Sequence, residues 1–491
     1  MHVTLQIALL SEIVADWLIV PLWEKDAPAG NVAELDARLG GLLAKLREQG
    51  DVAGKAKELT PIYQTAGIAA KRLLLLGLGP RDRADFASLL SASAAAARML
   101  SAKPCGRIAF ALPDGPSAET ALRACAAGFF QGSSTAGIRK NTVERAPPAE
   151  VCFVTASMDA AFAESVRRAE IEGRATNLAR ELVNTPPCDL YPETFAERAR
   201  ESAIKTGLEV QILDEQQLVV ERMNALLAVA RGSDRPPRLV VLRHRFGGDK
   251  PTLALVGKGV TFDSGGLSLK TNDQMVDMKC DMAGAAAVLG AMQAAAELAL
   301  PVNLVGVMAL VENMPSGKAM KLGDVIKARN GKTIEVLNTD AEGRLILADA
   351  LAYAVDLKAD HIVDLATLTG ACMVALGYDV AGLMSNDEAW SQKVLSAAQA
   401  AGEKAWPLPM LPHYGEMIKS TVADIKNTGG SRYAGAISAA KFLEEFVGTT
   451  PWAHLDIAGP SWAEHENPSR DAGGTGCFVR TLVELARTYG A

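Results

Sequence analysis

Hydrophobic residues along this 491-residue chain occur in short continuous runs that alternate with longer, Ala-rich segments. In the first third, the runs RLLLLGLG and RIAFALP are typical of strands. Further on, strand-like runs lie at 238–245, 252–258, 302–311, 333–338 and 361–368, with helical patterns near 279–299 and 344–357. Continuous apolar strands separated by helices are buried on both faces, so we expect an α/β fold whose mostly parallel, mixed sheet is flanked by helices.

A long, charged helical pattern separates the two halves of the chain and ends at Asn184-Thr185-Pro186-Pro187, where the prolines stop it. We therefore predict two domains joined by a helix. The smaller N-terminal α/β domain is expected at 1–165, the linker helix at 166–187 and the larger C-terminal domain at 188–491.

Composition excludes several classes of protein. Hydrophobic residues make up 49% of the chain and charged residues 22%, which is typical of a globular protein. The net charge of −7 gives no support for a nucleic-acid partner. The longest apolar stretch, Met282 to Ala296, is too short to span a bilayer, and the N-terminus carries Glu12 and Asp16 within its apolar pattern, unlike a secretory signal. We expect no membrane segment and a cytoplasmic protein.

Charged residues gather in three separate segments of the C-terminal part. The first follows the run TLALVG and holds Lys258, Asp263 and Lys270 around a glycine-rich turn. The others hold Asp281, at the start of a helix, and Asp340 with Glu342, after the run TIEVLN. Each segment has an ordinary explanation, such as a solvated loop, a partner for a helix dipole, or a capping box formed by Thr339 and Glu342.

Their positions after strands favour a joint function instead, because ligands bind outside the carboxyl ends of the strands in such sheets. Four carboxylates in one crevice repel one another unless they are neutralised, and two divalent ions would balance their charge. Paired metals clamp a carbonyl and activate water in hydrolases. A lysine that ligates a metal must be neutral, a protonated lysine suits a developing oxyanion, and Arg344 could hold an anion in bidentate fashion.

The same segments resemble the leucine aminopeptidase (cytosol aminopeptidase) family of two-metal exopeptidases. The octapeptide from Asn338 to Leu345 is similar to the family signature, and VGKGVTFDSGGLSLK and MKCDMAGAAAV are similar to its upstream metal-binding segments. DLATLTGA and PWAHLDIAG extend the resemblance over most of 184–480. The resemblance implies a metal-dependent aminopeptidase that releases leucine and other apolar N-terminal residues from peptides.

The resemblance also implies roles for single residues. A tighter metal would be held by Lys258, Asp263, Asp281 and Glu342, and an exchangeable one by Asp263, Asp340 and Glu342. Mn²⁺ or Zn²⁺ would be expected. Lys270 would stabilise the oxyanion, and Arg344 would anchor a bicarbonate. The positions that match the substrate cleft are Met278, Asn338, Ala341, Thr367, Leu368 and Gly370. The family further implies a homohexamer.

Two alternatives remain open. Ser264 and Lys270 could act as the pair of a Ser-Lys acyl hydrolase, although Phe262 occupies the first glycine position of G-x-S-x-G. The second alternative is an added DNA-binding or regulatory role. DNA binding would be detected as an affinity for DNA that depends on salt concentration.

Overall fold

The computed structural model describes residues 1–114, 117–135, 139–142, 144–155, 158 and 160–490. The chain divides into two compact units, which are described separately. The first consists of Met1–Asn177 and His465–Ala472, and the second of Leu178–Glu464 and Gly473–Ala491. The division falls within helix α5 (Ala160–Asn184), which holds most of the segment predicted as a linker helix. The short stretch 465–472, far along the chain, groups with the first unit.

The first unit is built on a six-stranded sheet of order β1-β6-β5-β2-β4-β3, in which only the edge strand β3 is antiparallel to its neighbour. Its strands are β1 (His2–Gln6), β2 (Trp17–Trp23), β3 (Leu59–Ile62), β4 (Leu73–Gly79), β5 (Arg107–Ala111) and β6 (Glu150–Val154). Its further helices are α1 (Gly30–Arg38), α2 (Leu42–Glu48), α3 (Phe86–Leu100) and α4 (Ala118–Ser133). β2 and β4 are buried along their whole length, so apolar side chains of this sheet form core on both faces.

The second unit has an eight-stranded mixed sheet of order β15-β14-β17-β13-β9-β10-β8-β7. Its strands are β7 (Glu209–Leu213), β8 (Arg238–Arg245), β9 (Thr252–Asp263), β10 (Asn303–Asn313), β13 (His361–Ala366), β14 (Ala381–Ser385), β15 (Ala405–Pro407) and β17 (Trp452–Asp456). The four central strands, β10, β9, β13 and β17, are mutually parallel. This sheet confirms the predicted fold class.

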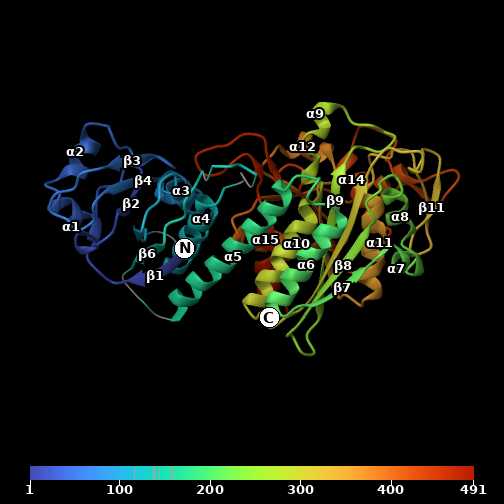
Figure 1. The fold of residues 1–491 in the computed structure, drawn as a ribbon, viewed down its shortest axis with the longest axis horizontal. Helices are drawn as coiled ribbons and strands as arrows, with labels where there is room; N and C mark the ends of the chain where they lie inside the picture. Colours follow the sequence, from blue (N-terminus) through green and yellow to red (C-terminus); the bar gives the residue numbers. More distant parts are fainter. Residues whose placement is uncertain (115–116, 136–138, 143, 156–157, 159, 491) are drawn as a thin grey trace. The chain divides into compact units, whose positions relative to one another are not determined.

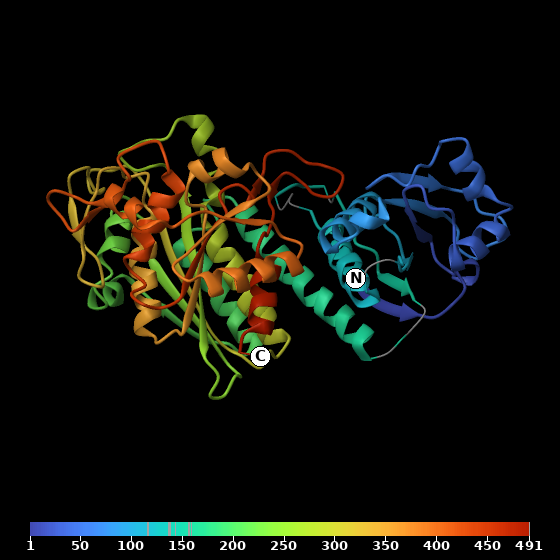
Figure 2. The same cartoon turned by 180° about the vertical axis from the view of Figure 1, so that it is seen from behind.

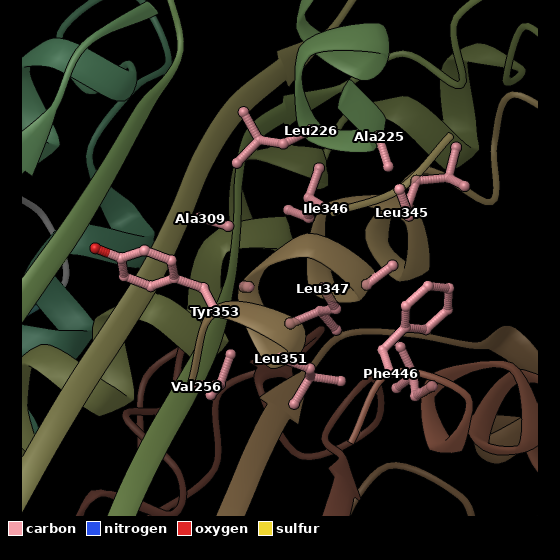
Figure 3. Packing of buried hydrophobic residues seen from close by; sticks show 14 of the residues in the cluster. Ala225, Leu226, Val256, Ala309, Leu345, Ile346, Leu347, Leu351, Tyr353 and Phe446 are labelled. Carbon is pink, nitrogen blue, oxygen red and sulfur yellow. The ribbon is translucent and has the colours of Figure 1, made fainter. Parts of the chain in front are cut away.

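Helices cover both faces of the eight-stranded sheet (Figures 1 and 2). They are α6 (Pro192–Thr206), α7 (Glu215–Val220), α8 (Asn224–Ala230), α10 (Ala283–Glu297), α11 (Gly343–Asp356), α12 (Gly370–Leu376), α13 (Glu388–Ala400), α14 (Gly435–Glu444) and α15 (Val479–Thr488). The short α9 (Asn272–Met275) lies beyond the ends of the strands (Figure 1). Figure 3 shows Leu347 and Leu351 of α11 packed near Val256 of β9. Among the described helices, none has the length and apolar character needed to cross a bilayer.

One expected strand takes a different place. The run TIEVLN forms only the three-residue strand β12 (Thr333–Glu335), which pairs with β11 (Val325–Lys327) and β16 (Ile425–Lys426) in a separate small sheet. The run TIEVLN alternates buried and partly exposed residues, because only one face of the β11-β12-β16 sheet lies against the core. A further two-stranded sheet joins β18 (Trp462–Ala463) and β19 (Gly473–Gly474). The run TIEVLN therefore does not continue the eight-stranded sheet.

Candidate active site

The carboxyl ends of the four parallel strands meet at one edge of the sheet, and each brings a polar side chain there. Asp263 is the last residue of β9, and Asn313 is the last residue of β10. The two residues are register partners. Asp456 ends β17, and Thr367 follows β13 directly. The sheet edge is thus a row of polar groups on a rigid, buried scaffold.

The remaining carboxylates come from two loops beside this edge. Asp281 lies in a 3₁₀ turn (Met278–Met282) that precedes α10, and its Oδ1 accepts a hydrogen bond of 2.7 Å from the Thr367 hydroxyl. Asp340 and Glu342 lie immediately before α11. The alternative of a Thr339 capping box is wrong. The Thr339 hydroxyl donates to the carbonyl of Gly265 at 2.7 Å, and no side chain in the described structure caps α11.

Two lysines lie among these carboxylates. Lys258 Nζ is 2.7 Å from Asp281 Oδ1 and 2.9 Å from Glu342 Oε1, and it donates to the carbonyl of Thr367 at 2.9 Å. Its side chain is 4% exposed. Lys270 Nζ is 2.9 Å from Asp263 Oδ2 and 2.5 Å from Asp340 Oδ1. The structure therefore brings together all six charged side chains that the sequence analysis selected for the metal site and the oxyanion.

Burial and mutual repulsion control the ionisation of this cluster. Burial raises the pKa of Asp281 and of Glu342 above their ordinary values, and the charge of Asp263 adds to the rise. Burial alone would lower the pKa of the Lys258 ammonium, but the charges of Asp281 and Glu342 outweigh it and raise that pKa. Four carboxyl groups against two lysines leave an excess of acceptors, which is the electrostatic condition for binding cations.

Two glycines allow the close approach of these groups. A Cβ at Gly343 would lie 2.6 Å from Lys258 Nζ, so only glycine leaves room for that side chain beside α11. Gly265 has φ +84°, and a Cβ there would lie 2.8 Å from Asp340 Oδ1. Any larger residue at either position would displace a member of the cluster.

The donor set fits divalent metal ions. Asp263, Asp340 and Glu342 each offer an oxygen, and these oxygens all lie within 4.8 Å of one another. Among the described residues, Asp281 Oδ2 and Glu342 Oε2 are buried and have no hydrogen-bond partner. Unpaired buried carboxylate oxygens are costly, and a bound cation would satisfy them.

Arg344, in the first turn of α11, offers a different chemistry. One guanidinium nitrogen donates to the carbonyl of Asn427 at 2.8 Å, and its Nε is buried without a partner in the described structure. Burial lowers the pKa of Arg344 to about 10, against the opposing charges of Glu342 and Asp456. A buried guanidinium with a free donor is suited to hold a small anion.

The six positions predicted to line a substrate cleft lie around this edge. Thr367 contacts both Lys258 and Asp281, as described above. The Asn338 side chain accepts from the backbone N–H of Asp340 at 2.9 Å, and the Leu368 N–H donates to Asp456 Oδ1 at 3.2 Å. Met278 begins the 3₁₀ turn and Gly370 begins α12. Ala341 lies between the two loop carboxylates.

Sequence reasoning did not select three buried residues that hold the site in place. Asn313 donates to Asp263 Oδ1 at 2.8 Å. The Asn427 amide donates to the carbonyl of Asn338 at 2.7 Å. Asp456 accepts from the Thr369 hydroxyl at 2.6 Å. Asn313 had a usable signal, since the polar pair Glu312-Asn313 ends the apolar run of β10, whereas Asn427 lies in an irregular segment without a pattern.

Two domain models of one protein family match the chain. One described as "Cytosol aminopeptidase family, catalytic domain" matches 177–483, and one described as "Cytosol aminopeptidase family, N-terminal domain" matches 19–136. Together with the fold and the site, these matches define a peptidase of the hydrolase class.

Proteins of similar sequence and structure also include aminopeptidases. The chain is 50% identical over 452 residues to a probable cytosol aminopeptidase of Rhodopirellula baltica, which covers 92% of this chain and 88% of the relative. It is 44% identical to one of Solibacter usitatus over the full length of both. A structure of a tomato leucine aminopeptidase mutant has a TM-score of 0.88 and 37% identity, covering 99% and 96% of the two chains. A structure of the bottromycin maturation enzyme BotP in complex with Mn has a TM-score of 0.85 and 36% identity. The match covers 97% of this chain and 100% of the BotP chain.

The chain belongs to the cytosol aminopeptidase family. It is an aminopeptidase, as the sequence motifs predicted.

Proposed function

We propose that the protein removes N-terminal residues from peptides by a two-metal mechanism, with a preference for leucine and other apolar residues. The observation that carries this proposal is the convergence of Asp263, Asp281, Asp340 and Glu342 with two lysines at one sheet edge. Carboxylate oxygens from distant segments, two of them without a protein partner in the described structure, are what two adjacent divalent ions require.

Each metal would have its own ligands. Lys258, Asp263, Asp281 and Glu342 would hold the tighter ion. The exchangeable ion would take Asp263, Glu342 and Asp340, the last through its side chain and main-chain carbonyl. The three carboxylates of this second set are the three whose oxygens lie within 4.8 Å of one another, which supports the assignment. Mn²⁺ or Zn²⁺ are the expected ions, and the Mn complex of BotP is consistent with the former.

When bound, two divalent ions polarise a substrate carbonyl and acidify water, which is the chemistry that peptide hydrolysis needs. The chain's own residues complete the site. Lys270 would donate a hydrogen bond to the carbonyl oxygen that gains negative charge during attack. Arg344 would hold bicarbonate, an anion able to accept a proton from the attacking water.

The substrate side chain would be received by the residues that surround the cluster. Met278, Asn338, Ala341, Thr367, Leu368 and Gly370 are the proposed contacts. Leu368 and Met278 are half-buried, so an apolar side chain placed against them would lose contact with water. The name of the tomato neighbour, a leucine aminopeptidase, is consistent with this preference.

The family name also supports a cytosolic location, and a homohexamer is the proposed assembly. Exposed apolar side chains on the second unit, among them Val374 at 90% and Trp406 at 63%, are consistent with self-association. The proposed domain limits stay at 1–165, 166–187 and 188–491.

A chelator experiment tests the proposal. Protein treated with a chelator should lose hydrolysis of leucine p-nitroanilide, and added Mn²⁺ or Zn²⁺ should restore it, with two ions bound per chain by elemental analysis. Full activity in protein shown to be free of metal would refute the mechanism. A panel of dipeptides that differ in the first residue would measure the preference separately.

The alternatives receive less support. The Ser264 hydroxyl donates to the carbonyl of Asn313 at 2.7 Å and is buried, while Lys270 contacts two carboxylates. This arrangement disfavours a Ser-Lys acyl hydrolase. DNA binding remains a separate hypothesis, and a gel shift at low salt with no retained species would reject it.

A further inference from the structure

The sheet of the first unit contains a point where the chain changes direction. β2 and β5 are parallel neighbours. After β2 the chain continues through α1 and α2 to β3 and β4, on one side of β2, whereas after β5 it continues through α4 to β6, on the other side. The segments that follow β2 and β5 therefore diverge. In open parallel sheets, this topological switch point leaves a crevice at the carboxyl ends of the strands where ligands bind.

A cavity of about 530 Å³ lies at this point of the first unit. Its size falls within the range of small-molecule sites. The ends of β2, β5 and β6 line it, together with the starts of α1 and α4. The apolar part of the lining includes Leu10, Leu22, Val32, Ala111, Val154 and Phe162. The cavity therefore suits a ligand with an apolar body.

Charged side chains also line this cavity. Arg81 pairs with Asp26 at 2.7 Å and with Asp114 at 3.1 Å. Arg47 donates to the carbonyl of Trp23 at 2.7 Å. Two arginines and two aspartates leave no net charge, which disfavours a polyanion such as a nucleoside triphosphate.

The same lining offers acceptors and donors to a small polar group. The side chains of Asp26 and Asp114 are 40% and 69% exposed, so their oxygens can accept from an ammonium group. Helix α1 begins at Gly30, and no side chain in the described structure caps it. Its first N–H groups can donate to a carboxylate. The guanidinium groups of Arg47 and Arg81 lie in the same lining, and they already donate to the Trp23 carbonyl and to the carboxylates of Asp26 and Asp114, so they add positive charge beside the start of α1.

We propose that this cavity binds a zwitterion with an apolar side chain, either a free apolar amino acid or an apolar dipeptide. The apolar lining would receive the side chain, and Asp26 and Asp114 would receive the ammonium group. The first N–H groups of α1, beside the positive charge of the two arginines, would receive the carboxylate. Peptides and free amino acids are the substrates and products of an aminopeptidase, so the proposed ligand is present wherever this enzyme works. The proposal adds a second ligand site to the chain and does not depend on the two-metal mechanism.

Calorimetric titration of the full, chelator-treated chain with L-leucine and with L-leucyl-L-leucine tests the proposal. Removing metal suppresses turnover and metal-dependent binding, so failure of the two-metal mechanism cannot imitate failure of this site. We expect one ligand per chain. Asp26→Asn and Ala111→Leu, which alter the charge and the volume of the cavity, should each weaken binding by about tenfold. Asp82→Asn, an exposed position outside the lining, should leave it unchanged.

The outcomes separate the sources of the ligand. Binding of leucine alone, of the dipeptide alone, or of both supports the proposal and identifies which zwitterion the cavity takes. Absence of binding up to millimolar concentration overturns it, as does binding that neither Asp26→Asn nor Ala111→Leu weakens. Adenosine or inorganic phosphate is titrated in parallel. One of these ligands could bind, lose affinity in the same variants and displace the zwitterion. The site would then belong to another class of ligand, and the proposal would fail.

Discussion

The side-chain amide of Asn313 donates a hydrogen bond of 2.8 Å to Oδ1 of Asp263, across the ends of two neighbouring parallel strands. The same oxygen accepts from the backbone N–H of Gly265 at 2.8 Å. The Asn313 amide also donates to the carbonyl of Thr339, next to Asp340. One buried amide thus orients a carboxylate proposed to bridge two metals and holds the loop that carries another proposed ligand.

Replacing Asn313 should therefore weaken metal binding. Loss of a partner that orients a ligand typically lowers metal affinity by about tenfold or more, so we expect Asn313→Ala to reduce Mn²⁺ affinity by about that factor. Equilibrium dialysis measures it directly. Asn303→Ala, at the other end of the same strand, is the matched control. Equal affinity in the two variants would contradict the role assigned to Asn313.

Lys270→Ala should retain the metals and lose most of the catalytic rate. An ammonium group aimed at the developing negative charge is worth about 10²-fold to 10³-fold in kcat. Metal content by elemental analysis and kcat with leucine p-nitroanilide are measured on the same sample. The exposed Lys318→Ala variant serves as the control. Normal turnover in Lys270→Ala would remove this lysine from the mechanism.

Metal binding should release protons and should strengthen as the pH rises. The pKa of Lys258 is raised by its carboxylate neighbours, so the lysine is protonated at neutral pH and must lose that proton to become a ligand. Burial also raises the pKa of Glu342, which favours its protonated form before metal binds. Titrations of Mn²⁺ in buffers with different ionisation enthalpies give the number of protons released. The number should fall in Lys258→Met, and an unchanged value would show that the proton comes from elsewhere.

Asp471 should stabilise the first unit. Its carboxylate pairs with Arg98 and with Arg145, and all three side chains are nearly buried. Removing one partner of a buried ion pair costs about 3 kcal/mol, so Asp471→Asn should lower the free energy of unfolding by about that amount in chemical denaturation. Glu466→Gln is the control, because Glu466 also contacts Arg98 but is 75% exposed and should contribute little.

The pH dependence of this pair has a defined sign. Burial alone would raise the pKa of Asp471, but the charges of Arg145 and Arg98 outweigh it and lower that pKa. Stability from the pair is therefore present above the ordinary aspartate pKa and is lost as the pH falls through the lowered value. If wild type and Asp471→Asn still differ by the same free energy at acid pH, the ion pair is not the cause.

Much of the second unit could be predicted from local patterns. The run predicted at 238–245 is β8, the run at 252–258 lies within β9, and the run at 302–311 begins one residue before β10. These predictions succeeded because strands buried on both faces must be apolar throughout. The run at 333–338 was misplaced, since its few apolar residues serve a small separate sheet.

The sequence by itself determined the family, the α/β class and the six charged residues of the cluster, because motif spacing and apolar runs are local properties of the chain. Only the tertiary structure decided that Thr339 supports a loop and does not cap a helix, and that Asn427 and Asp456 hold the site. It alone joined residues 465–472 to the first unit and left a cavity where the segments after β2 and β5 diverge. These features depend on contacts between residues far apart in the chain, which the packing of the folded elements brings together and no local pattern encodes.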